Sequence, residues 1–127
     1  MKQVIHTKDA PEPIGPYSQA IKSGNFLFVS GQVAINPATG NLKLDNVHEE
    51  TTQIMLNIGA ILKAAGMDYS NIVKTTIFLT NMNNFSSVNE VYGSFFKTDF
   101  PARETVQVAR LPKDVNIEIS VVAADEK

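Results

Sequence analysis

The segment from residue 47 to residue 66 carries one apolar stripe at the spacing of an α-helix, between two strand-like runs. The runs, 24–35 and 71–80, are rich in β-branched and aromatic residues, which favour strands. Gly66 closes the helical pattern as a C-terminal stop. A helix that is apolar on one side only must lie against another element, so this order predicts a helix packed on a sheet.

A second helical stripe covers residues 83–96, which begin with asparagines suited to an N-cap. Two further strands are predicted at 104–110 and 116–124, joined by the turn sequence LPKD. Two such helices can cover one face of a single sheet, which predicts a two-layer α+β fold. The other face still carries Val, Ile and Phe, so we expect the chain to associate with itself.

Length and composition indicate one globular domain over residues 1–127, with 43% hydrophobic and 19% charged residues. The net charge of −2 predicts no general attraction to nucleic acid or to anionic membranes. The chain has no cysteine, which excludes disulfides and thiol catalysis. No apolar run has the length of a membrane span and the start lacks a signal-peptide core, so we expect a cytoplasmic protein.

Arg103 and Glu118 interrupt the last two strand-like stretches and are the first candidates for a site. Arg103 is either a surface ion-pair partner or a planar fork for a carboxylate or phosphate. Glu118 is either a solvated strand residue or an acid or base. If the two strands form a hairpin that turns near 112–114, Glu118 lies opposite residue 108. The pair would then lie a few residues apart along the sheet, or meet across a subunit boundary.

Two upstream stretches place polar groups at unusual positions. In IGPYSQA, Gly15 and Pro16 restrict the backbone before Tyr17, which is either a half-buried aromatic or a hydroxyl that faces a ligand. In FVSGQV, Ser30 and Gly31 interrupt an apolar strand. A glycine inside a strand marks either a bulge or the close approach of a ligand or of backbone.

These stretches together resemble the RidA/YjgF family of reactive imine and enamine deaminases. The likeness includes IGPYSQA at 14–20, VSGQ at 29–32, Pro-Ala-Arg at 101–103 and Ile-Glu-Ile at 117–119, and it runs nearly end to end. The resemblance implies a chorismate-mutase-like fold with a mixed sheet covered on one face by two helices. It also implies a homotrimer with a central β-barrel and three clefts at the subunit boundaries.

Residue by residue, the family's carboxylate-binding arginine matches Arg103, and its water-positioning acid matches Glu118. Its tyrosine and serine positions match Tyr17 and Ser30, and Gly31 lies beside the site. Thr105 stands where many members carry cysteine, so it at most shapes the pocket. Glu104 departs from the family, which has a small or apolar residue there. By strand alternation Glu104 should point away from Arg103, so we expect altered packing or an interface contact.

The implied reaction is hydrolysis of 2-aminoacrylate, 2-aminocrotonate and their imine tautomers to 2-oxo acids and ammonium. No cofactor is expected, because the chain carries no phosphate loop, dinucleotide fingerprint or metal-ligand cluster. His6 and His48 lack spaced partners for a metal. Two alternatives stay open: a non-catalytic regulator that binds 2-oxo acids, and action on nucleic acid, against which the acidic balance argues.

Overall fold

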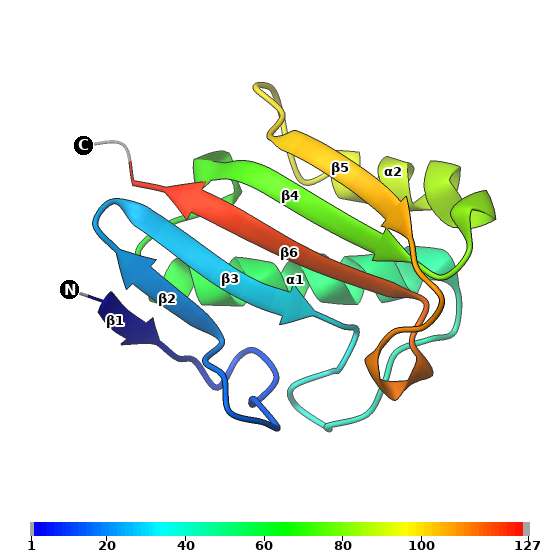
Figure 1. Ribbon diagram of the computed structural model, residues 1–127, viewed down its shortest axis with the longest axis horizontal. Helices are drawn as coiled ribbons and strands as arrows, with labels where there is room; N and C mark the ends of the chain where they lie inside the picture. The colour runs from blue at the N-terminus through cyan, green and yellow to red at the C-terminus, as the bar shows by residue number, and fades with distance from the viewer. Residues whose placement is uncertain (1, 126–127) are drawn as a thin grey trace.

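The computed structural model describes residues 2–125 (Figure 1). Its strands are β1 (Lys2–Ile5), β2 (Ala20–Ser23), β3 (Phe26–Gln32), β4 (Ile72–Leu79), β5 (Ala102–Gln107) and β6 (Ile117–Ala124). Its helices are α1 (Val47–Ala64) and α2 (Phe85–Gly93), with short 3-10 turns at Tyr69–Asn71, Met82–Asn84 and Pro112–Asp114. The strands form one mixed sheet in the order β1-β2-β3-β6-β4-β5, in which only β4 and β5 are parallel among the described pairs.

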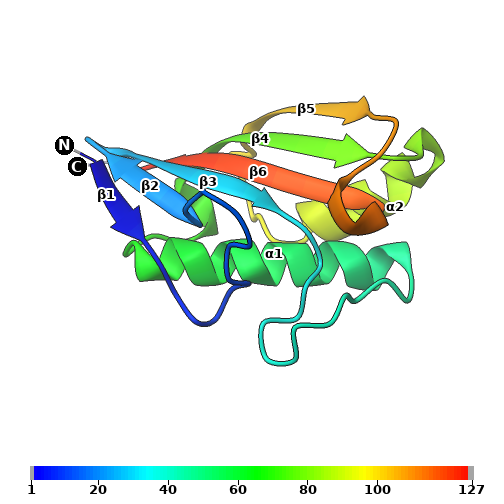
Figure 2. The same ribbon diagram turned by 60° about the horizontal axis from the view of Figure 1, so that its bottom comes forward.

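Both helices lie on the same face of the sheet, which confirms the predicted two-layer α+β architecture (Figure 2). Helix α1 begins after Asn46, whose side chain accepts a hydrogen bond from the Glu49 N–H at 2.8 Å. It stops before Gly66, whose φ of +76° ends the helix as predicted. The apolar stripe is completely buried against the sheet, which stabilises the fold by about 1.5–3 kcal/mol for each large side chain. Its members are Ile54, Met55, Ile58, Ile61 and Leu62.

The last two strands do not form the hairpin that the short turn between them allowed. Strand β5 pairs in parallel with β4 at the edge of the sheet, whereas β6 is inserted between β3 and β4. The reason is polarity. Strand β6 (IEISVVAA) is mostly apolar and suits a central position, while β5 (ARETVQ) is largely polar and suits an edge.

Three local details also differ from the prediction. Strands β1 and β2 were not predicted, because KQVI and AIKS are short and partly polar. Helix α2 is shorter than predicted at both ends, because residues 82–84 form a separate 3-10 turn and the helix ends at Gly93. The asparagine that caps this turn is Asn81, which accepts from the Asn83 N–H at 2.9 Å, and Asn84 makes no side-chain cap.

The face of the sheet away from the helices stays open and partly apolar. Phe26 and Phe28 of β3 are each 48% exposed there, and Val106 of β5 is 40% exposed. The same face carries an ion pair between Lys74 and Glu104, with Nζ and Oε1 3.2 Å apart. Among residues 2–125, no helix combines the length and the apolarity that crossing a bilayer requires.

Candidate functional site

Glu118 lies directly over Gly31, at an irregularity of strand β3. The pairing of β3 with β6 shifts register between Val29 and Gln32, which is the bulge that the sequence indicated. A Cβ atom on Gly31 would overlap Glu118 Oε2 and would lie 2.8 Å from Glu118 Cδ. The bulge is therefore confirmed, and the group that approaches Gly31 closely is a side chain, where the sequence predicted a ligand or backbone as the alternative to a bulge.

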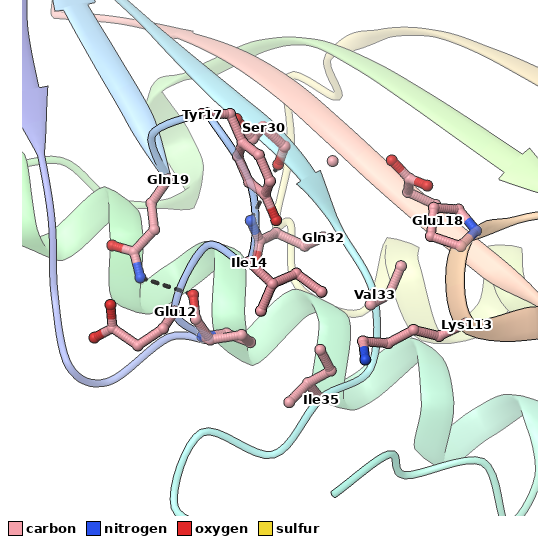
Figure 3. Close-up of a pocket in the computed structure, with 13 residues that line it drawn as sticks. Glu12, Ile14, Tyr17, Gln19, Ser30, Gln32, Val33, Ile35, Lys113 and Glu118 are labelled. Carbon is pink, nitrogen blue, oxygen red and sulfur yellow. Dashed lines mark hydrogen bonds between the residues drawn. The ribbon is translucent and has the colours of Figure 1, made fainter. Parts of the chain in front are cut away.

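A cavity of about 420 Å³ opens beside this contact (Figure 3). Four residues proposed from the sequence line it: Tyr17, Ser30, Gly31 and Glu118. Figure 3 shows Tyr17 on one side of the space and Glu118 on the other. The other polar lining residues were not predicted from the sequence, and they are Glu12, Gln19, Gln32 and Lys113.

Gln19, which is 2% exposed, fixes the segment of the cavity lining that contains Tyr17. The Gln19 side-chain oxygen accepts from the Thr7 N–H at 2.8 Å, and its amide donates to the carbonyls of Thr7 at 3.0 Å and Pro11 at 2.9 Å. The Ser30 hydroxyl donates to the Ser18 carbonyl at 2.6 Å. This bond connects the segment that contains Tyr17 to the bulge in β3. The Ser30 hydroxyl proton is thus engaged in structure, and its oxygen can still accept a hydrogen bond.

The pKa of the Glu118 carboxyl is raised above its ordinary value, because burial disfavours the charged form. A carboxylate whose pKa moves toward neutrality is a stronger base once it has lost its proton. Among the lining residues, Glu118 thus has the raised pKa that suits a carboxylate to accept a proton.

The turn that forms another part of the cavity has an unusual backbone. Lys113 and Asp114 both adopt left-handed conformations, with φ of +58° and +56°. Such a conformation costs about 1–2 kcal/mol for each residue that is not glycine. The Arg110 guanidinium donates to Asp114 Oδ1 at 2.6 Å across this turn.

Arg103 lies on the other side of the sheet, toward α2. Its guanidinium carbon is 5.5 Å from the ring centre of Phe85 and 5.3 Å from that of Tyr92, which are cation–π distances. Its Nη1 donates to Asn89 Oδ1 at 2.6 Å. A second hollow beside it is lined by Asn89, Tyr92, Gly93, Phe100 and Pro101. Asn89 was not predicted from the sequence either.

Thr105 and Glu104 follow the predicted alternation. Glu104 points to the open face, where it accepts from the Thr76 hydroxyl at 2.9 Å and pairs with Lys74, and these two contacts hold the pKa of Glu104 below its usual range. Thr105 is on the opposite face, the side of Arg103. The Thr105 hydroxyl is buried without a hydrogen-bond partner among the described residues.

Within one chain, Arg103 and Glu118 lie on opposite faces of the sheet. Arg103 pairs with Thr75 of β4, which is buried under α2, whereas Glu118 pairs with Phe78 on the open face. Two strand spacings and three residues along β4 separate their Cα atoms by roughly 14 Å. Within one chain, a three- or four-carbon molecule is therefore too short to contact both side chains.

His6 and His48 each pair with a single carboxylate, Glu12 at 2.9 Å and Glu90 at 3.4 Å. Across residues 2–125, no three side chains of the metal-binding types gather into a group that could hold an ion.

Comparisons with known proteins agree with this fold. The family model described as Endoribonuclease L-PSP matches residues 7–125. A RutC family protein of Pyrococcus horikoshii is 52% identical over 99% of this chain and 100% of its own. The human 2-iminobutanoate/2-iminopropanoate deaminase is 49% identical over 97% of this chain and 90% of its own. A Rid-family protein of Yersinia pestis, solved by crystallography, has a TM-score of 0.96 and 52% identity, over 98% of this chain and all of its own. The chain belongs to the RidA/YjgF family.

Proposed function

We propose that this protein hydrolyses reactive 2-imino acids and their enamine tautomers to 2-oxo acids and ammonium. The observation that carries the proposal is a half-buried carboxylate, Glu118, fixed over a glycine inside a cavity and with a raised pKa. The name and the 49% identity of the human relative support the same substrate class, 2-iminobutanoate and 2-iminopropanoate.

We further propose that the working unit is a trimer in which Arg103 of one copy faces the Glu118 cavity of the next. Two observations support this assembly: the two side chains lie on opposite faces of one sheet, and the face that carries Glu118 exposes Phe26 and Phe28. The planar fork of Arg103 would bind the substrate carboxylate through two charge-assisted hydrogen bonds. Asn89 and the rings of Phe85 and Tyr92 hold that fork in place.

The reaction then needs one acid–base group. An enamine first takes a proton at C3 and becomes the protonated imine, with a C2=NH2+ group. Glu118 accepts a proton from a water molecule while the water oxygen bonds to C2 and the C2–N π electrons return to nitrogen, which gives a carbinolamine. Glu118 gives this proton to the amine nitrogen. It then takes the proton of the C2 hydroxyl as the C2=O bond forms and the C2–N bond breaks, so that ammonia leaves, takes up the proton from Glu118 as ammonium, and the 2-oxo acid remains. A positioned acid–base group of this kind contributes about 10²–10⁴ in rate.

A coupled assay tests the activity: threonine dehydratase generates the imine, and the appearance of 2-oxobutanoate is followed. We expect the wild-type protein to accelerate the reaction and Glu118→Gln to lower kcat by about 10²–10⁴-fold, because an amide cannot accept the proton. The glutamine has the same shape above Gly31, so circular dichroism should show an unchanged fold. A wild-type protein that gives no acceleration over the buffer rate would end the proposal.

The dependence of kcat on pH follows from the same carboxyl group. Glu118 must be ionised to act as a base, so kcat should fall as the pH drops through its pKa, with a midpoint above the ordinary value of 4.5. Within one chain the charged neighbours in the cavity are Lys113 and Glu12, and Glu12 is exposed and paired with His6. In the proposed assembly Arg103 of the next copy also faces Glu118, and the substrate carboxylate that it binds offsets its charge during turnover. Glu12→Gln should therefore leave the midpoint in place, whereas a midpoint at or below 4.5 would contradict the assignment of Glu118 as the base.

The description of the matching family model makes RNA cleavage the second candidate. The net charge of −2 gives no general attraction to a phosphate backbone. Incubation of the same preparation with labelled single-stranded RNA separates the two functions. If the preparation cleaves RNA at all, we expect Glu118→Gln to cleave it at the same rate. Cleavage by the wild-type protein that disappears in Glu118→Gln would favour the RNA-cleaving function.

A further inference from the structure

Glu50, in the first turn of α1, is a completely buried carboxylate. Its Oε2 accepts hydrogen bonds from the backbone N–H groups of Asn116 at 2.9 Å and Ile117 at 3.1 Å. Its Oε1 accepts from the Asn116 side-chain amide at 2.8 Å. These bonds offset the cost of burying the charge, and the amino end of α1 adds a favourable dipole. Glu50 therefore ties α1 to the start of β6.

The segment that Glu50 binds, Asn116 and Ile117, lies in the chain between two residues that line the cavity, Lys113 and Glu118. Asn116 and Ile117 follow the left-handed residues Lys113 and Asp114 and directly precede Glu118. On its other side, the Asn116 carbonyl accepts from the Thr80 N–H at 3.1 Å. A turn with two strained residues keeps its shape only when its surroundings hold it. The bonds to Glu50 are thus part of what holds this turn.

We infer that Glu50 is a positioning residue for Glu118, which it acts on through the backbone at Asn116 and Ile117. This inference rests on the function proposed above. The Glu118 carboxylate has little room to adjust because it lies against Gly31. A displacement of about 1 Å at a reacting group can lower the rate on the order of 100-fold. Arg103, proposed to bind the substrate, lies on β5 and contacts α2, so substrate affinity should depend little on Glu50.

Three variants test the inference in the coupled imine assay. Glu50→Ala removes the partner of three donors, the backbone N–H groups of Asn116 and Ile117 and the Asn116 side-chain amide. We expect kcat to fall by about 10- to 100-fold while KM changes less than about twofold. Glu50→Gln should stay within about threefold of wild type, because its oxygen can accept both backbone bonds and its amide can donate to a flipped Asn116. Glu49→Ala is the control: it removes the exposed carboxylate next in the same turn, which pairs with Lys43, and should behave as wild type.

A charge swap keeps the test decisive if Glu50→Ala does not fold. Asn116→Asp sets a second carboxylate against Glu50, and we expect a fall in kcat of about tenfold or more. Adding Glu50→Gln to Asn116→Asp again places one carboxylate opposite one amide. The carboxylate is then at position 116 and the amide at position 50. The double variant should therefore recover kcat to within about threefold of wild type.

The outcomes separate this inference from the proposed function. A wild-type protein without imine hydrolysis refutes the function, and the inference falls with it. Given an active wild type, a folded Glu50→Ala protein with normal kcat overturns the inference alone. A charge swap that does not restore kcat overturns it as well, as does a Glu50→Ala protein whose loss appears in KM and leaves kcat unchanged.

Discussion

Arg103→Ala and Glu118→Ala chains, each inactive alone, are expected to regain about a quarter of the wild-type activity after they are unfolded together and refolded in equal amounts. Each proposed site takes Arg103 from one copy and Glu118 from the next. In a random mixture, half of the copies supply each intact side chain, so about one site in four is complete. Imine hydrolysis per site measures the recovery, and native mass spectrometry verifies that mixed assemblies form.

The double variant Arg103→Ala/Glu118→Ala, refolded with an equal amount of wild type, provides the matched control. If the site spans two copies, about a quarter of the sites remain complete, whereas about half remain if both side chains act from one chain. Activity of about half in this control, together with none in the mixture of single variants, would refute the shared site. The geometry of the sheet predicts the opposite result, because the two side chains lie on different faces.

The layers of the fold could be predicted from the sequence, but the order of the strands could not. Periodicity shows which side of an element is buried, and the stripe of α1 was read correctly. Neighbours within the sheet depend on contacts between residues far apart in the chain. The polar composition of β5 indicates an edge strand. This signal is present in the sequence, but the short turn after β5 favoured a hairpin with β6.

The cavity residues Tyr17, Ser30, Gly31 and Glu118 were proposed from the sequence, and the structure brings these four together. Spacing alone did not connect them, and the family resemblance did. The missed residues Glu50 and Asn89 share a signal. Each is a polar residue on the apolar face of a helix. Glu50 lies four residues before Ile54, and Asn89 lies four residues after Phe85. A polar group on the buried face of a helix needs a partner, and that partner is here in the site or beside it.

Gly31→Ala is expected to lower kcat by about 100-fold or more and to destabilise the protein by about 1–3 kcal/mol. The added Cβ overlaps the Glu118 carboxylate, so either the side chain leaves its place or the bulge in β3 moves. Gly31 has no positive φ, so an alanine backbone is tolerated there and the damage comes from Glu118. Steady-state kinetics and thermal unfolding of the folded variant measure the two effects.

The double variant Gly31→Ala/Glu118→Ala isolates this contact. The three atoms nearest to the added Cβ all belong to the Glu118 side chain, and they are Oε2, Cδ and Cγ. Truncating Glu118 removes the overlap, so Gly31→Ala should cost little stability in the Glu118→Ala background, and the coupling between the two changes should reach about 1–3 kcal/mol. Equal destabilisation in both backgrounds would show that Gly31 serves the bulge alone. A strong coupling would mean that this glycine is present to let the Glu118 carboxylate lie against the sheet.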